Sequence, residues 1–234
     1  MKNNTKEILS TYVEPNAFKY GLKIASPFSE EFLAVVANGG EVIEVARNET
    51  KKLENNLSQS KLLIVYVSEG ATFEYFESSK SQIVGKNDIH IILAGRGAKA
   101  SITSSYDLVG ESEVDVYHKV YHEAPHTISK IDVRGVLKDK AHIIYRSDIA
   151  MGKGIEAKGE ESASFLILSE EARVDAIPSL DIESSDVRCS HSLSIKDISG
   201  DELFYPMSRG LDESGAEKIL VDGFLKKEFE VLEK

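Results

Sequence analysis

The segment Cys189-Ser190-His191 brings a thiol and an imidazole, two ligands of soft metals, within two residues of each other. In a β-strand, residues i and i+2 point to the same face, so Cys189 and His191 would share one face. The pair could bind a metal, act as a nucleophile with its base, or be a buried structural cysteine beside a hydrogen-bonded histidine. Two ligands do not complete a metal site. A second chain, a sulfide or another protein would have to supply the rest.

Three histidines, His118, His122 and His126, recur at intervals of four residues in VYHKVYHEAPH. On a helix this spacing would line up metal ligands on one face. The surrounding pattern is that of a strand, however, and Pro125 is incompatible with a helix. In a strand, His118 and His122 would lie about 13 Å apart on the same side, which is too far for one metal ion. We therefore expect surface or turn histidines.

Motifs of the common enzyme classes are missing from the sequence. Gly95-Arg96-Gly97 lacks the remainder of a phosphate-binding loop, and no G-x-S-x-G, HExxH or CxxC segment occurs. We interpret the acidic pairs Glu160-Glu161 and Glu170-Glu171 as solvated corners rather than as glycosidase carboxylates. The sequence therefore shows no motif of these enzyme classes. A polysaccharide-active enzyme stays an alternative, and it would require a groove of clustered charges on one face.

The elements that would position these residues are strands. Apolar residues alternate with a period of two, and a short strand recurs every 8–12 residues from about residue 40 to about residue 197. Charged corners such as Lys138-Asp139, small residues within the strands, and the repeated pairs Gly70-Ala71 and Gly97-Ala98 favour a β-solenoid. A jelly roll is the competing architecture on pattern alone.

The two ends differ from this β core, which we assign to residues 39–198. The short N-terminal segment, residues 1–38, contains expected helices at Thr5–Val13 and Ser29–Val36. The C-terminal region, residues 199–234, shows a helical stripe that begins after Asp212, a suitable N-cap. This tail carries more large apolar residues than two short helices can bury, so we expect some to be exposed for a partner: Phe204, Tyr205, Met207, Leu211, Leu220, Phe224, Leu225 and Phe229.

Composition excludes several classes of function. The 234 residues carry a formal charge of −11, which disfavours binding to a nucleic-acid backbone. The sequence contains 1 cysteine, so neither a disulfide framework nor a metal site of several thiolates from one chain is possible. No apolar run is long enough to span a membrane, and the N-terminus lacks the apolar core of a signal peptide. We expect a cytoplasmic protein.

Three stretches resemble the SufB/SufD family of the SUF iron–sulfur cluster assembly system: HEAPHTISKIDVRGVL (122–137), FLILSEEARVDAIPSLDIESSDVRCSH (165–191) and LFYPMSRGLDESGAEKILVDGF (203–224). The resemblance implies a right-handed parallel β-helix, mainly β, with a short N-terminal α/β segment and a small C-terminal helical region. It further implies a scaffold subunit rather than an enzyme, and one that pairs through its β-helix, as a homodimer or with a SufB/SufD-type subunit. A SufC-type ABC ATPase would bind the C-terminal helices.

The resemblance also implies roles for single residues. Cys189 and His191 match the Cys-Ser-His segment of SufD-type subunits and become candidate ligands of a transient iron–sulfur cluster at the subunit interface, with no permanently bound cofactor. Ala163 occupies the position of a cysteine found in SufB-type subunits. A degenerate structural paralogue that binds the ATPase but no cluster is therefore a further alternative. The residues expected to contact the ATPase are Phe204, Tyr205, Met207, Arg209, Leu220 and Phe224.

Overall fold

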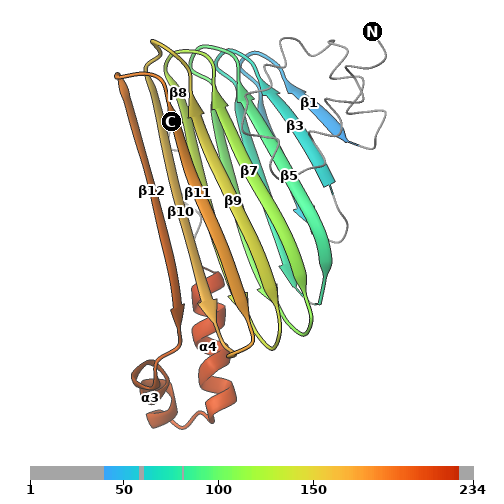
Figure 1. Ribbon diagram of the computed structural model, residues 1–234, viewed down its shortest axis with the longest axis vertical. Coiled ribbons are helices and arrows are strands. Elements are labelled where there is room, and N and C mark those ends of the chain that lie inside the picture. Colours follow the sequence, from blue (N-terminus) through green and yellow to red (C-terminus); the bar gives the residue numbers. More distant parts are fainter. Residues whose placement is uncertain (1–39, 58–60, 81, 227–234) are drawn as a thin grey trace.

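The structure is a computed structural model that describes residues 40–57, 61–80 and 82–226. The helices expected at Thr5–Val13 and Ser29–Val36 lie outside the described residues, as does Phe229. The described chain begins as β-structure and ends in two helices (Figure 1). Among these residues, no helix is long and apolar enough to cross a membrane.

The described residues form twelve strands in two parallel sheets of six. One sheet has the order β1-β3-β5-β7-β9-β11 and the other β12-β10-β8-β6-β4-β2, so successive strands alternate between the sheets. Every pairing is parallel, which confirms the β-solenoid and excludes the antiparallel jelly roll. The strands are β1 Glu41–Val45, β2 Thr50–Asn56, β3 Lys61–Val67, β4 Thr72–Lys80, β5 Val84–Leu93, β6 Lys99–Leu108, β7 Glu113–His122, β8 Thr127–Leu137, β9 His142–Met151, β10 Ala157–Ile167, β11 Arg173–Ile182 and β12 Val187–Asp197.

Small residues fill the corners, as the sequence predicted. Ala71 and Ala98 follow glycines with positive φ, and both are fully buried because little room remains where the chain turns between the sheets. At Gly95 a Cβ atom would lie 2.0 Å from the backbone nitrogen of Glu69, so only glycine fits there. The corner at Lys138-Asp139 instead places the non-glycine Asp139 at φ 61°.

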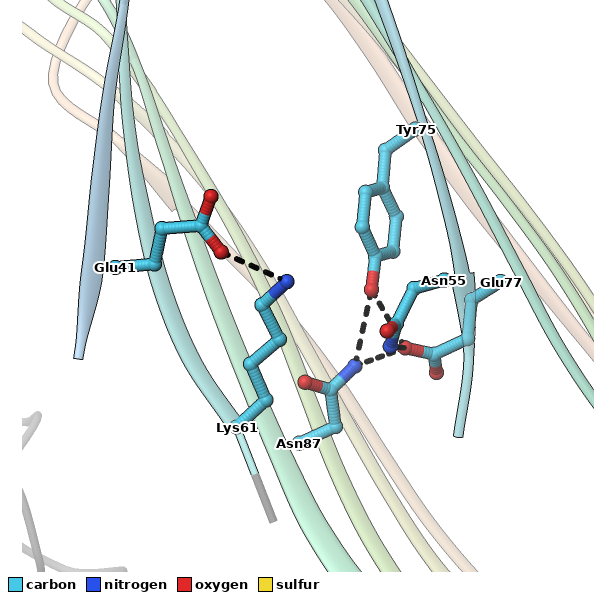
Figure 2. A network of polar contacts seen from close by, with 6 residues as sticks. All are labelled: Glu41, Asn55, Lys61, Tyr75, Glu77 and Asn87. Atoms are coloured by element: carbon cyan, nitrogen blue, oxygen red, sulfur yellow. Dashed lines mark hydrogen bonds and ion pairs between the residues drawn. The ribbon is translucent and has the colours of Figure 1, made fainter. Parts of the chain in front are cut away.

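The core lies between the sheets and is built from inward-facing alternate residues. The largest buried side chains include Tyr75, Tyr106, Tyr145, Phe73 and Phe165. We call each pair of successive strands, one from each sheet, a coil of the solenoid. In the early coils the core is interrupted by a polar cluster around Glu77, which is 3% exposed. Figure 2 shows Tyr75, Asn55 and Asn87 converging on this carboxylate, while Lys61 forms an ion pair with Glu41 at 3.0 Å. Tyr106 donates to the other carboxylate oxygen.

Two helices follow the last strand and lie near its carboxyl end (Figure 1). Helix α3, Gly200–Ser208, begins with a capping box between Ser199 and Glu202 and is followed by Gly210 at φ 97°. Helix α4, Glu213–Leu225, begins at the predicted N-cap, because Asp212 accepts a hydrogen bond from the backbone of Gly215 at 2.8 Å. Both helix starts are therefore explained by local sequence.

Helix α4 is fastened to the solenoid by residues of strand β8 and the corner after it. Arg134 donates to the backbone carbonyl of Phe224 at 2.8 Å, and its guanidinium lies 5.6 Å from the centre of the Phe224 ring. Lys138 forms an ion pair with Glu217 at 2.7 Å. The hydrogen bond to the Glu217 carboxylate, aided by its charge, raises the pKa of Lys138. The helix is thus held in one orientation against the sheet.

Candidate functional site

The last coil, formed by β11 and β12, leaves the solenoid interior open. Within the described chain these strands end their sheets, so nothing described pairs with their outer edges. Inward-facing side chains of this coil are partly exposed: Ile182 is 40% exposed, Leu193 40% and Ile195 44%. Phe165, which pairs with Ile195 one coil earlier, is fully buried. We refer to this apolar end, with its two strand edges, as the open end.

Cys189 and His191 both lie on β12 at the open end, facing inward. Parallel pairing with β10 places Cys189 beside Gly159 and His191 beside Glu161, and the register partners of both lie on the buried face of β10. The shared face expected for a strand is therefore present. Cys189 is half-buried and packs against the core, whereas His191 is exposed because no further coil of the described chain covers it.

The thiol of Cys189 is not an activated nucleophile. Burial raises its pKa to about 11, the charge of Glu161 acts in the same direction, and a backbone hydrogen bond at Ser190 opposes them. Near neutral pH the sulfur therefore keeps its proton, and a thiolate–imidazole nucleophile is disfavoured. A bound metal ion displaces that proton, so the same environment is compatible with metal binding.

Glu161 is a buried member of this site that the sequence analysis missed. The prediction of a solvated corner is wrong for this residue, which is 4% exposed, although it holds for Glu170 and Glu171. The carboxylate oxygen Oε1 accepts hydrogen bonds from Tyr145 at 2.8 Å and from Ser147. Burial raises the pKa of Glu161. The signal was the alternation within β10, where Glu161 is in phase with the inward-facing Ala157, Gly159, Ala163 and Phe165.

The second oxygen of Glu161, Oε2, is buried and has no hydrogen-bond partner among the described residues. Ala163, two residues further along the same strand, is 1% exposed and pairs with Leu193 of β12. It therefore lies one coil before the Cys189 strand, on the same inward face. In the described part of the chain no three His, Cys, Asp or Glu side chains already converge as a metal site.

The predicted surface position is wrong for His118 and His122. Both face inward from β7, with His118 fully buried and His122 1% exposed. His122 bonds Thr127 and Ser129 through its two ring nitrogens, each at 2.8 Å, and so ties β7 to β8. Burial lowers the pKa of His118 to about 3 and that of His122 to about 4. His126 does lie in a turn, where it pairs with Glu156 at 2.9 Å.

The tail residues fall into two groups. Phe204 is 71% exposed and Tyr205 65%, and Met207, Arg209 and Leu211 are also exposed. Leu220, Phe224 and Leu225 are half-buried, and Phe224 contacts Arg134 of the solenoid. Ile219, which the sequence analysis did not select, is 55% exposed. Each helix therefore presents at least one large apolar residue to solvent.

A cleft of about 500 Å³ separates the corner between β10 and β11 from the two helices. Its apolar lining comes from both parts of the chain, including Leu168 of the corner and Leu203 of α3. Acidic side chains also line it, namely Glu170, Asp197, Glu213 and Glu217. The helices and the corner thus form one continuous surface with an acidic recess.

Comparison with known proteins gives a consistent result. A family model described as "SUF system FeS cluster assembly, SufBD core domain" matches residues 20–224. The chain is 31% identical over 171 residues to an iron-sulfur cluster assembly SufBD family protein of Staphylococcus saprophyticus, an alignment that covers 71% of this chain and 36% of that protein. Proteins of the same description from Staphylococcus haemolyticus and Staphylococcus epidermidis are each 30% identical over 176 residues, or 74% of this chain and 37% of theirs. The aligned part is thus little more than a third of these relatives.

Proposed function

Because this chain belongs to the SufBD family, whose role is in SUF iron–sulfur cluster assembly, we propose that it is a scaffold subunit that holds a nascent cluster as cargo. One observation carries the proposal: Cys189 and His191 face inward in the last coil, where the interior is open. Sulfur and imidazole nitrogen are suitable ligands for iron. A site with few ligands at an exposed end can release its cluster, whereas a site closed by thiolates would retain it.

The open end is the proposed pairing surface. No described strand pairs with the outer edges of β11 and β12, and Ile182, Leu193 and Ile195 expose apolar surface beside them. Such an edge invites pairing with another sheet, and an apolar centre is typical of stable dimer interfaces. The partner is a second copy of this chain or a SufB/SufD-type subunit. Two copies would bring two thiols and two imidazoles together, which is sufficient for a bridged cluster.

The exposed tail is the proposed docking surface for a SufC-type ABC ATPase. Phe204 and Tyr205 of α3 and Ile219 of α4 provide apolar anchors, and large aromatic side chains contribute most at interface centres. The contacts of Arg134 and Lys138 hold α4 in place, so that docking would require little reordering. The acidic cleft beside the helices favours basic side chains on the partner.

One observation favours a second candidate, a structural paralogue that binds the ATPase but no cluster. The position expected for a SufB-type cysteine is occupied by Ala163, which is buried and offers no ligand. This candidate shares the fold, the pairing surface and the tail with the leading proposal. It differs only at Cys189 and His191, and a reconstitution experiment separates the two.

Anaerobic reconstitution with ferrous iron and sulfide tests the cluster site. We expect the wild-type protein to develop sulfide-to-iron absorption, and Cys189→Ala to lose most of it. Ser190→Ala is the matched control, because Ser190 is exposed on the same strand with its side chain on the opposite face. Full cluster absorption in Cys189→Ala would overturn the assignment, and no absorption in the wild-type protein would favour the paralogue.

A pull-down with a SufC-type ATPase tests the tail. We expect Phe204→Ala combined with Tyr205→Ala to weaken binding about tenfold or more, since buried aromatic anchors each contribute on the order of 1–2 kcal/mol. Ile177→Ala serves as the control, because Ile177 is 60% exposed on β11 and lies outside the tail. Unchanged binding by the double variant would exclude Phe204 and Tyr205 as anchors of the docking surface.

A further inference from the structure

Glu161 and His191 are neighbours on adjacent strands of one sheet. The register of β10 and β12 pairs them directly, and neighbouring strands are about 4.8 Å apart. Cys189 lies two residues before His191 on the same face, beside Gly159. Gly159 has no side chain, and apolar side chains of β9 fill the space above it, since a Cβ atom there would lie 2.9 Å from Met151 Cε and 3.0 Å from Ile149 Cγ2. The three polar side chains therefore occupy one patch at the boundary between the buried core and the open end.

The two carboxylate oxygens of Glu161 differ in their hydrogen bonding. Tyr145 and Ser147 hold Oε1, whereas Oε2 is buried and lacks a hydrogen-bond partner in the described part of the chain. A buried carboxylate oxygen without a partner is costly, so its retention calls for a reason. Carboxylates that bind metals in proteins are typically oriented in this way, with hydrogen bonds from neighbouring groups and an oxygen left for the ion.

We propose that Glu161 is a third ligand of the Cys189–His191 site and supplies Oε2 to an iron ion held there. This inference rests on the proposed function and extends it by one residue. Cys189 and Glu161 are the partly and fully buried members, and the exposed His191 can turn its imidazole toward them. The donor set would be one sulfur, one nitrogen and one oxygen, which suits a divalent transition metal and leaves positions for sulfide or a partner chain.

A purely structural role is the competing explanation for Glu161. In that case its function would be complete in the hydrogen bonds of Oε1 to Tyr145 and Ser147, and Oε2 would be an unused atom. The two explanations differ in what glutamine does at this position. Glutamine preserves the shape and can keep its carbonyl oxygen toward Tyr145 and Ser147, but it places an amide where the metal would find Oε2.

The experiment is anaerobic titration of the full-length chain with Co²⁺ alone, followed by thiolate-to-cobalt absorption. We expect Glu161→Gln to weaken Co²⁺ affinity about tenfold or more while the thiolate band persists at saturation. Glu160→Gln is the matched control, since Glu160 precedes it on the outward face, is exposed and pairs with Lys158 at 3.0 Å. Its affinity should equal that of the wild-type protein.

A second variant keeps the inference testable if Glu161→Gln does not fold. Ser147→Ala removes one donor to Oε1 but leaves the carboxylate, so we expect a severalfold weaker Co²⁺ affinity if Glu161 is a positioned ligand. Wild-type affinity in folded Glu161→Gln, or in Ser147→Ala should Glu161→Gln fail to fold, would overturn the inference. Failure of the proposed function would give a different result, because Cys189→Ala would then keep the Co²⁺ affinity and the absorption spectrum of the wild-type protein.

Discussion

Two buried carboxylates, Glu77 in the early coils and Glu161 in the late ones, occupy comparable positions but differ in how many of their oxygens accept hydrogen bonds. Both face inward from the same sheet, and burial raises the pKa of both. Both oxygens of Glu77 accept hydrogen bonds, from Tyr75, Asn55 and Asn87 on one and Tyr106 on the other (Figure 2). Among the described residues, Glu161 has hydrogen-bond donors on one oxygen only.

The difference follows from the neighbouring side chains, because β4 and β10 are each the second strand from an end of the same sheet and are both paired on two sides. Residues of β2, β5 and β6, together with Tyr75 of β4 itself, supply the donors of Glu77. Glu161 is followed by the last coil alone, and its register neighbour there is the exposed His191. A fully satisfied polar network stabilises one arrangement of the core. A polar network with one unpaired carboxylate oxygen at the open end can instead bind a ligand through that oxygen.

The same substitution should therefore destabilise the protein much more at Glu77 than at Glu161, and this is the largest effect we expect. In Glu77→Gln, an amide would face the amide donors of Asn55 and Asn87 or the hydroxyl of Tyr106. A buried donor left without an acceptor costs about 1–3 kcal/mol, so we expect a loss near ~3 kcal/mol in the free energy of unfolding. Glu161→Gln should lose less than about 1 kcal/mol. Urea unfolding followed by circular dichroism measures both, and equal losses would contradict the distinction.

A second prediction concerns acid stability near Glu161. His118 is the register partner of Ser147, and both of its ring nitrogens are buried without partners among the residues described. Its pKa falls from an ordinary value near 6.5 to about 3 because burial disfavours the imidazolium. Between about pH 6.5 and pH 3 the unfolded chain therefore binds a proton at His118 that the folded chain does not bind. The free energy of unfolding consequently falls as the pH drops below about 6.5.

His118→Phe should remove that loss. Phenylalanine can keep the edge-on contact with Tyr145, whose ring centre lies 5.7 Å away, and it leaves no polar atom unpaired. At about pH 4.5 the variant should exceed the wild-type protein in unfolding free energy by roughly 2–3 kcal/mol, beyond any difference at pH 7. His122→Phe is the contrasting variant, because it removes the ring nitrogens that bond Thr127 and Ser129 and should therefore lower the free energy of unfolding at pH 7. A pH-independent difference for His118→Phe would refute the burial argument.

The sequence predicted the solenoid well and the polar interior poorly, for physical reasons. Alternation and the small residues at corners reflect local geometry, so they are visible in any stretch of the chain. Glu161 was misjudged because it was interpreted with its neighbour Glu160 rather than with the strand phase that it shares with Ala163. His118 and His122 follow the same inward phase as Val114, Val116 and Val120, which could have placed them inside.

Contacts between distant segments could not have been predicted in this way. The half-buried state of Phe224 depends on Arg134, ninety residues earlier in the chain, and no local pattern encodes that contact. The same holds for the donors of Glu161, which come from the opposite sheet. Cys189 and His191 could be predicted to share a face because they are two residues apart in one strand. Glu161 lies beside them only through the register between β10 and β12, which the local sequence does not reveal.

The smallest predicted effect concerns the reactivity of Cys189, and it tests the electrostatic link to Glu161. With a pKa of about 11, the thiol should be alkylated at pH 8 roughly a hundredfold more slowly than in the unfolded chain, and the rate should rise about tenfold per pH unit up to that value. The charge of Glu161 adds to the rise in pKa, so Glu161→Gln should accelerate alkylation. Glu77→Gln, measured where it is still folded, should leave the rate unchanged because Glu77 lies in the early coils. Stopped-flow or mass-spectrometric alkylation at several pH values gives these rates. Equal acceleration by both variants would indicate general loosening of the fold, and the thiol and carboxylate would then not belong to one site.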